Sequence, residues 1–384
     1  MIAALPALVG HGRAMRRTLR PLLDHAAAVP GADRYRKHFS AHAHLLILLC
    51  HVLDSSPSLR QTHQKLVDLG WERLGITPSL SRSQLARSST SRPPEAAEEL
   101  LKLVLARVRA KTKAVRGDAQ WLLVIDSTFI TLSAKLCGWS QHGGHAAGVR
   151  VHTAYDLTAG VPVEVTLGLA DTNDIGAFAQ RDLTPYQGAT LIMDRGYYGH
   201  VQFVRMLDAG VHFVVRRHAQ VTVKVTEERP VSPERTKDGD QIVSDQVVTL
   251  GSPNHRDSPQ LSQMRLVVSE NTKGIRVDLV TDRFDLEAGE IAMLYRRRWQ
   301  IELFFRWIKH QLKITTPLGT SRAAMWLTIL IHACVAALLM LIDEARPKHI
   351  TKIAWARGIA GVLATTFQTR PRGPALQPTA LVKT

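Results

Sequence analysis

The chain has 384 residues and a mass of 42.6 kDa, which allows two or three domains of ordinary size. Its 49 Lys and Arg outnumber its 33 Asp and Glu, and the resulting net charge of +16 favours a polyanionic partner, with nucleic acid first and an acidic membrane surface second. The three cysteines are far apart in the sequence, which excludes a disulfide scaffold and a cysteine-rich zinc site and suits a reducing cytoplasm.

Residues 1–117 are predicted to form a helical, basic domain. They carry 19 Lys and Arg against 8 Asp and Glu, a net charge of +11, whereas the rest of the chain has a net charge of +5. Ser58 is a suitable N-cap for a helix, and a helix over 94–113 has its acids early and its bases late, as the helix dipole favours. A helical bundle with solvated basic faces is one interpretation; the charge of the whole segment favours a DNA-binding domain.

A mixed α/β pattern follows over 118–210. Residues 121–132 predict a buried strand followed by a second apolar stretch, and 149–170 alternate like a hairpin. Another apolar strand begins at 190 and ends on an Asp. Short β-like runs separated by polar loops then fill 211–285, which indicates a β-rich insertion.

The C-terminal part is predicted to be helical before it becomes Pro-rich. A long helix is expected over 286–313, and an apolar helix near 322–343. The latter contains a mainly apolar stretch of 18 residues, 325–342, at the short end of a membrane-spanning length. We expect a buried core helix and no membrane, with a single span as the alternative. Residues 346–384 form a tail that is Pro-rich from 369 and is expected to be disordered.

Two aspartates each stand at the end of an apolar run, where we expect a strand to end and the next side chain to face a cleft. Asp126 comes after Leu-Leu-Val-Ile, and Asp194 after Thr-Leu-Ile-Met. A buried carboxylate without a partner is costly, so such positions usually have a cap, an ion pair or a metal. Taken alone, each has a structural explanation, because Asp126 can cap a turn and Asp194 can pair with Arg195.

The predicted helix over 286–313 supplies a third acid, Glu302. Tyr295, Arg298, Glu302 and Lys309 are spaced at offsets of 0, 3, 7 and 14 residues. At about 100° per residue they fall within a sector of about 60° on a continuous helix. A lone Glu/Arg pair would indicate a solvated charge network, but a Glu flanked by Tyr, Arg and Lys on one face is not a typical surface pattern.

These residues resemble the DDE transposases of bacterial insertion sequences, in the insertion-sequence-four family. That family's helix signature is Tyr, two residues, Arg, three residues, Glu, six residues, Lys, which matches Tyr295, Arg298, Glu302 and Lys309 at every spacing. The family's second aspartate lies in a D-R-G-Y-Y-like context, as Asp194 does, and its first precedes small hydroxyl residues, as Asp126 does. The resemblance covers about residues 5–345.

The resemblance implies an RNase H-like catalytic core over 118–210 and 286–345, interrupted by the β-rich insertion over 211–285. It also implies cut-and-paste transposition by an enzyme that cleaves phosphodiesters and transfers strands. Asp126, Asp194 and Glu302 would be the catalytic acids and would hold two Mg²⁺ ions, for which Mn²⁺ can substitute. Tyr295, Arg298 and Lys309 would bind DNA phosphates. The partners would be double-stranded DNA, as terminal inverted repeats and target, and a second copy in a homodimer.

Two other functions stay open from the sequence. One is a metal-dependent RNase H-like nuclease without strand transfer. The other is a catalytically inactive DNA-binding relative that acts as a repressor, against which the three intact acids argue. For the transposase we expect a cytoplasmic, nucleoid-associated location.

Overall fold

The computed structural model describes residues 17–34, 38–56, 58–70, 76, 79–116, 120–135, 137–141, 146–218, 221–251, 259–311 and 318–342. The predicted tail lies outside these residues. The chain forms two compact units. We call the described residues of 1–103 and 318–342 the helical unit, and the described residues of 104–311 the sheet unit.

The helical unit begins with a helix over residues 17–27, followed by α2 (Ala41–Leu53), α3 (Leu59–Leu69), α4 (Arg82–Ser91) and the first part of α5 (Glu95–Arg116). Serines cap three of these helices: Ser40 caps α2, Ser58 caps α3, and Ser81 forms a capping box with Gln84 at α4. The predicted helix start at Ser58 is confirmed.

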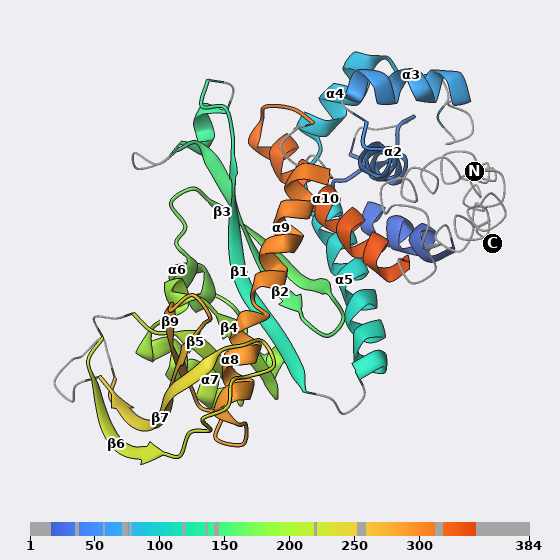
Figure 1. Ribbon diagram of the computed structural model, residues 1–384. Coiled ribbons are helices and arrows are strands. Elements are labelled where there is room, and N and C mark those ends of the chain that lie inside the picture. The colour runs from blue at the N-terminus through green and yellow to red at the C-terminus, as the bar shows by residue number, and fades with distance from the viewer. Residues whose placement is uncertain are drawn as a thin grey trace, which may run out of the picture. The chain divides into compact units, whose positions relative to one another are not determined.

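The apolar helix α10 (Arg322–Ile342) packs against α2 and α4 in the same unit (Figure 1). Among the described residues it is the one helix long and apolar enough to cross a membrane, but 83% of its 18-residue apolar window is buried inside the structure. Such burial is what a core helix requires. The predicted segment 286–345 is divided between the two units: α10 belongs to the helical unit, and the helices before it belong to the sheet unit.

The sheet unit contains a nine-stranded sheet in the order β3-β2-β1-β4-β5-β9-β8-β7-β6. Its strands are β1 (Trp121–Thr131), β2 (Gly148–Asp156), β3 (Val161–Leu169), β4 (Ala189–Met193), β5 (His212–Arg216), β6 (Val223–Arg229), β7 (Gln241–Leu250), β8 (Leu261–Glu270) and β9 (Arg276–Thr281). β4 and β5 run parallel to β1, and every other neighbouring pair is antiparallel. The predicted hairpin over 149–170 is confirmed as β2 and β3.

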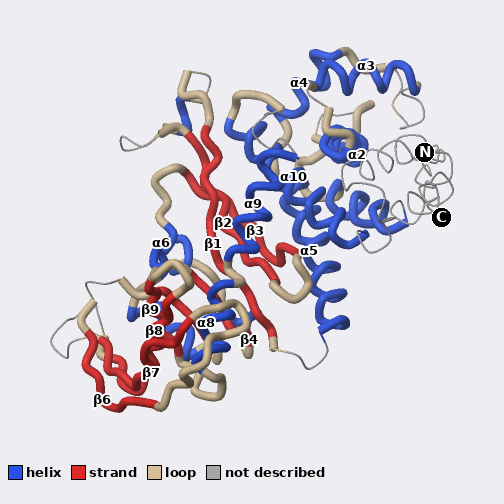
Figure 2. Tube along the Cα trace, viewed as in Figure 1, coloured by secondary structure: helices blue, strands red, loops and turns tan. Residues whose placement is uncertain are grey.

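The short helices and turns of the sheet unit are α6 (Asp174–Ala179), α7 (His200–Asp208), α8 (Ala288–Arg296), α9 (Trp299–Gln311) and the 3-10 turns η3 (Gly138–Ser140), η4 (Thr184–Tyr186) and η5 (Arg195–Tyr197). α9 packs against β1, and α8 packs against β4, β5, β7 and β8. Figure 2 shows both helices beside the strands.

A buried ion pair ties the added strands to the segment before α8. The guanidinium of Arg265 on β8 donates to both carboxylate oxygens of Asp245 on β7, at 2.8 Å each. It also donates to the backbone carbonyls of Arg283 and Leu286. Since both side chains are almost fully buried, this network fixes the entry into α8.

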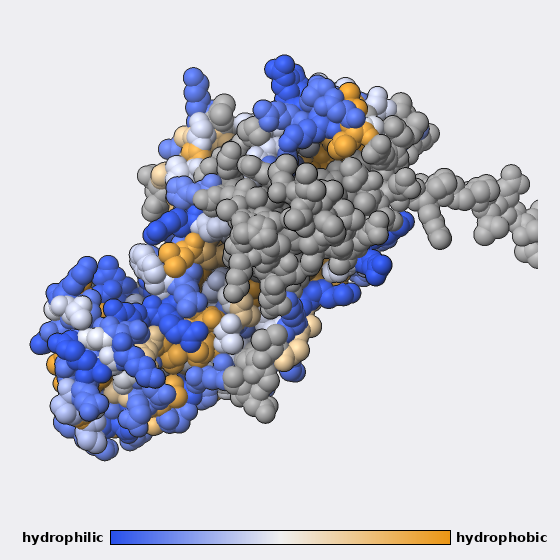
Figure 3. Space-filling model, turned by 45° about the vertical axis from the view of Figure 1, so that its right-hand side comes forward, coloured by the Kyte–Doolittle hydropathy of each residue, from blue (hydrophilic) through white to orange (hydrophobic). Residues whose placement is uncertain are grey.

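The surface of the molecule is mainly polar on the face shown in Figure 3. Among the residues coloured there, hydrophilic ones predominate and hydrophobic ones are scattered among them.

Candidate active site

Asp126 and Asp194 leave neighbouring parallel strands at the same level. β1 and β4 are paired as far as Ile125 and Met193, and the next residue of each chain segment is one of the two aspartates. Asp194 follows the end of β4, as predicted. Asp126 does not end its strand: β1 continues to Thr131 because β2 pairs with it along that whole length. The sequence interpretation of Asp126 as a strand end was therefore wrong.

Glu302 reaches the same place from α9, and an arginine joins it to Asp126. The guanidinium of Arg298 donates to Asp126 Oδ2 at 2.6 Å and to Glu302 Oε1 at 2.6 Å. The Asp194 carboxylate accepts a hydrogen bond from the backbone N–H of Gly196 at 2.8 Å, and its charge acts on Asp126. The structure thus joins Asp126 and Glu302 through one cation, and it places Asp194 beside Asp126 at the end of the neighbouring strand.

The helix that carries the signature is broken at Arg298, so the prediction of one continuous helix is wrong. α8 ends at Arg296 and α9 begins at Trp299. The backbone N–H groups of residues 298, 300 and 301 each bond to the carbonyl three residues earlier, as in a 3-10 turn. No Pro or Gly lies between 290 and 311 to announce this break in the sequence. Its consequence is that Arg298 stands at a turn, where its side chain reaches both carboxylates.

Tyr295 lies beside Arg298, whereas Lys309 is more remote. The guanidinium carbon of Arg298 is 6.0 Å from the centroid of the Tyr295 ring, and burial raises the pKa of the Tyr295 hydroxyl. Lys309 is two turns beyond Glu302 on α9, and partial burial lowers the pKa of its ammonium group. Among the described interactions, none joins Lys309 to an acid of the site.

The carboxylates are suited to a hard cation, but Arg298 now lies between two of them. Burial raises the pKa of Asp126 to about 6, against the opposing effect of Arg298. A buried carboxylate with a raised pKa is stabilised by any cation that it contacts. Within the described ranges, no three His, Cys, Asp or Glu side chains are placed closely enough to hold a metal ion. A metal would therefore compete with Arg298 for the oxygens of Asp126 and Glu302.

Sequence reasoning missed two residues beside these acids, Asp174 and Arg150. The carboxylate of Asp174, the first residue of α6, accepts a hydrogen bond from the Ser127 hydroxyl at 2.5 Å. Arg150 on β2 donates to the same hydroxyl at 3.2 Å and lies 3.6 Å from Asp174. In the sequence Asp174 follows the N-cap Asn173, so it has the pattern of an ordinary first-turn acid. Only the fold places it at the site.

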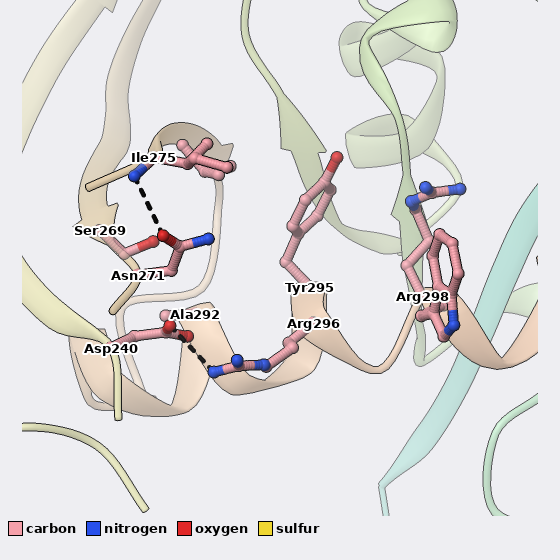
Figure 4. A pocket seen from close by; sticks show the side chains of 10 residues that line it. Asp240, Ser269, Asn271, Ile275, Ala292, Tyr295, Arg296 and Arg298 are labelled. Carbon is pink, nitrogen blue, oxygen red and sulfur yellow. Dashed lines mark hydrogen bonds and ion pairs between the residues drawn. The ribbon is translucent and has the colours of Figure 1, made fainter. Parts of the chain in front are cut away.

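A pocket of ≈ 300 Å³ opens next to Tyr295 and Arg298. Its lining residues come from β8, β9, the loops that precede β7 and β9, and the α8–α9 region, and they are Asp240, Ser269, Asn271, Ile275, Val277, Ala292, Tyr295, Arg296, Arg298 and Trp299. Figure 4 shows the Asp240–Arg296 ion pair at its base, with Tyr295 and Arg298 pointing the same way from the α8–α9 turn. The pocket therefore shares two side chains with the acid site.

The chain is similar in sequence to known transposases. The family model described as a transposase DDE domain matches residues 96–338. A transposase of Sinorhizobium fredii is 33% identical over 70% of this chain and 72% of its own length. The transposase for insertion sequence element IS5377 of Geobacillus stearothermophilus is 26% identical over 65% of this chain and 64% of its own length.

A third relative and one solved structure extend the comparison. The transposase for insertion sequence element IS4SA of Synechocystis is 25% identical over 78% of this chain and 80% of its own length. The piggyBac transposase in a synaptic complex with hairpin DNA has a TM-score of 0.49 and 10% identity over 87% of this chain and 73% of its own. On the family match and these relatives, the chain belongs to the DDE transposases of bacterial insertion sequences, enzymes of DNA transposition that depend on divalent metal ions.

Proposed function

We propose that the chain excises its own mobile element by cleaving phosphodiesters at the terminal inverted repeats and joins the freed ends to target DNA. Asp126, Asp194 and Glu302 are the proposed catalytic residues. The observation that carries this proposal is the placement of the three acids: Asp126 and Glu302 share the Arg298 guanidinium, and Asp194 follows β4 at the level at which Asp126 lies on the paired strand β1. Two acids that already share a cation are suited to share another.

The proposed fold of the catalytic core is RNase H-like. Support comes from the order β3-β2-β1-β4-β5, in which β2 is antiparallel to both its neighbours while β4 and β5 follow β1 in parallel. The proposed core comprises 118–210 and 286–345, of which α10 packs in the helical unit, and β5 joins it from the segment 211–285 that was predicted as the insertion. Strands β6 to β9 of that insertion extend the same sheet.

The proposed cofactor is a pair of Mg²⁺ ions, replaceable by Mn²⁺, held by Asp126, Asp194 and Glu302. Bound there, the ions would lower the pKa of a nucleophile and stabilise charge on the leaving oxygen. The protein's part is to bring the three carboxylates to one place. Arg298, Tyr295 and Lys309 are proposed to contact DNA phosphates, Arg298 by exchanging its two carboxylates for a phosphate when DNA and metal bind.

DNA recognition is proposed for residues 1–117, whose net charge of +11 supports it. The proposed assembly is a homodimer on two element ends, and the proposed location is the cytoplasm, associated with the nucleoid. A nuclease without strand transfer is the second candidate. A repressor without activity is disfavoured, because it would need none of the converging acids.

The test is cleavage of a DNA fragment that carries one element end. Asp126→Asn, Asp194→Asn and Glu302→Gln remove a charge without removing volume, so each is expected to abolish cleavage in Mg²⁺ while leaving binding to the end intact. Glu290→Gln on the neighbouring helix α8 is the matched control and is expected to cut normally. A site variant that cuts as fast as the wild type removes that residue from the active site.

A further inference from the structure

Asp174 stands closer to the proposed catalytic acids than its sequence context indicates. Two observations locate it. Its Oδ1 accepts from the hydroxyl of Ser127, the residue that follows Asp126 on β1. Its Oδ2 is 3.4 Å from the position that a Cβ on Gly196 would take, and Asp194 Oδ1 is 3.1 Å from the same point. Asp174 therefore contacts the segment of one catalytic aspartate and faces the other across a glycine.

Asp174 approaches from the side of β1 that Asp126 does not use. Successive strand residues point to opposite faces of a sheet, and Asp126 is directed to Arg298 and Glu302. Ser127 is paired across the strands with His152 of β2, on the face to which Asp174 belongs. Asp174 thus lies on the opposite face of β1 from the Asp126 side chain, so we do not assign it as a fourth metal ligand beside Glu302.

The polar cluster around Asp174 contains buried groups without hydrogen-bond partners. His152 is 3% exposed, its Nδ1 is 3.8 Å from Asp174 Oδ1, and neither of its ring nitrogens has a hydrogen-bond partner. The hydroxyl of Tyr197 is buried without a partner as well. Burial raises the pKa of that hydroxyl, and the charges of Asp174 and Asp126 raise it further, which places it among these acids.

A network that served the fold alone would satisfy its buried donors, because each one left unpaired costs about 1–3 kcal/mol. Here a carboxylate that is one quarter exposed is left beside two unpartnered buried groups. Groups of this kind collect at functional sites, where the polar partner arrives with a ligand.

We propose that Asp174 is a positioning residue of the active site, which anchors β1 through Ser127 and adds the negative charge that strengthens divalent-cation binding by Asp126 and Asp194. This inference rests on the proposed metal-binding role of those aspartates. The hydrogen bond from the Ser127 hydroxyl to one oxygen of Asp174 would hold β1 in position when cations and DNA bind at Asp126. Its second oxygen faces Asp194 across Gly196, where a side chain would separate the two.

If the negative charge of Asp174 strengthens metal binding, its removal should change the metal affinity, whereas the loss of a purely structural residue should not. At a dielectric close to that of water, a unit charge roughly 6–13 Å from a divalent cation changes its affinity roughly three- to tenfold. Asp174→Asn keeps the shape and an acceptor for Ser127 but removes the charge. Ser127→Ala keeps the charge but removes the anchor, so it should reduce the maximal rate with a smaller change in metal affinity.

The experiment measures Mn²⁺ binding to the full-length protein and the Mg²⁺ concentration that gives half-maximal cleavage of an element end. Asp174→Asn is expected to weaken Mn²⁺ binding and to raise the Mg²⁺ midpoint roughly three- to tenfold, with the melting temperature near that of the wild type. Asp171→Asn, an exposed residue three positions earlier with the same charge change, is the control and should leave the midpoint in place.

Gly196→Ala provides a second variant that leaves every charge in place. Its new methyl group would lie between the Asp174 and Asp194 oxygens and is expected to raise the Mg²⁺ midpoint as well. An unchanged midpoint in Asp174→Asn, or an equal loss of rate at every Mg²⁺ concentration, overturns the inference. If the wild type does not bind Mn²⁺, or if Asp126→Asn binds it equally well, the proposed metal site itself fails.

Discussion

Replacing Arg298 is expected to tighten metal binding while damaging catalysis. In the structure this guanidinium makes two charge-assisted hydrogen bonds of 2.6 Å, to Asp126 and Glu302. The side chains of Asp126, Arg298 and Glu302 are 14%, 17% and 32% exposed, so water screens the contacts only in part. A metal that takes these oxygens must first break both bonds.

The size of the effect follows from the net strength of such bonds. A hydrogen bond to a charged group contributes about 1.5–3 kcal/mol. The released guanidinium regains water, so we count the equivalent of one bond and not two. At about 1.4 kcal/mol per factor of ten, Arg298→Ala should bind Mn²⁺ roughly ten- to a hundredfold more tightly than the wild type when DNA is absent.

Mn²⁺ titration of the DNA-free protein tests this directly. Arg298→Lys should be intermediate, because an ammonium group is a point charge and cannot bridge two carboxylates as a guanidinium fork does. Arg296→Ala is the control, since Arg296 lies two residues before Arg298 and pairs with Asp240 at 2.9 Å instead. Cleavage by Arg298→Ala should stay impaired at saturating Mg²⁺, because alanine cannot bind the DNA phosphate that Arg298 is proposed to hold. Mn²⁺ affinity equal to or below that of the wild type would refute the competition between Arg298 and metal.

Three further predictions concern pH, salt and stability. Burial raises the pKa of Asp126 to about 6, so metal binding should weaken up to about tenfold for each pH unit below 6. The metal-free fold should gain stability as the pH falls through 6, because the folded state then binds a proton that the unfolded state does not. Titration calorimetry measures the first effect and scanning calorimetry the second. Arg82→Ala and Arg87→Ala, at exposed positions of α4, should each lower the logarithmic salt slope of DNA binding by about 0.9 for every phosphate that the arginine neutralises, as measured by titration at several salt concentrations. Asp245→Ala leaves the buried Arg265 charge unpaired and should cost about 3–5 kcal/mol of unfolding free energy in urea.

Much of the fold could be predicted because local pattern and burial agree. The alternation over 149–170 and the small residues at its turn, 158–160, define the β2–β3 hairpin, and the Ser58 cap defines the start of α3. The position of Asp194 followed from a short, mainly apolar and fully buried strand, whose pairing with β1 and β5 ends at Met193.

The remaining features depend on contacts distant in sequence. Asp126 lies within β1 because β2 extends the pairing beyond it, and residue order alone does not show how far a partner strand reaches. The break at Arg298 has no Pro or Gly to mark it, and the two acids on which the arginine acts are 172 and 4 residues away. Asp174 resembles a helix-start acid until α6 packs against η5 and brings it to Asp194.

The most direct test of the account is a strand-transfer assay with a plasmid that carries both element ends and a separate target plasmid. The wild type in Mg²⁺ should produce target molecules joined to the element through its 3′ ends, and Glu302→Gln should produce neither cleaved nor joined DNA while still binding the ends. Cleaved ends without joined products would identify a nuclease instead of a transposase. Joined products formed equally well by Glu302→Gln would contradict the site itself.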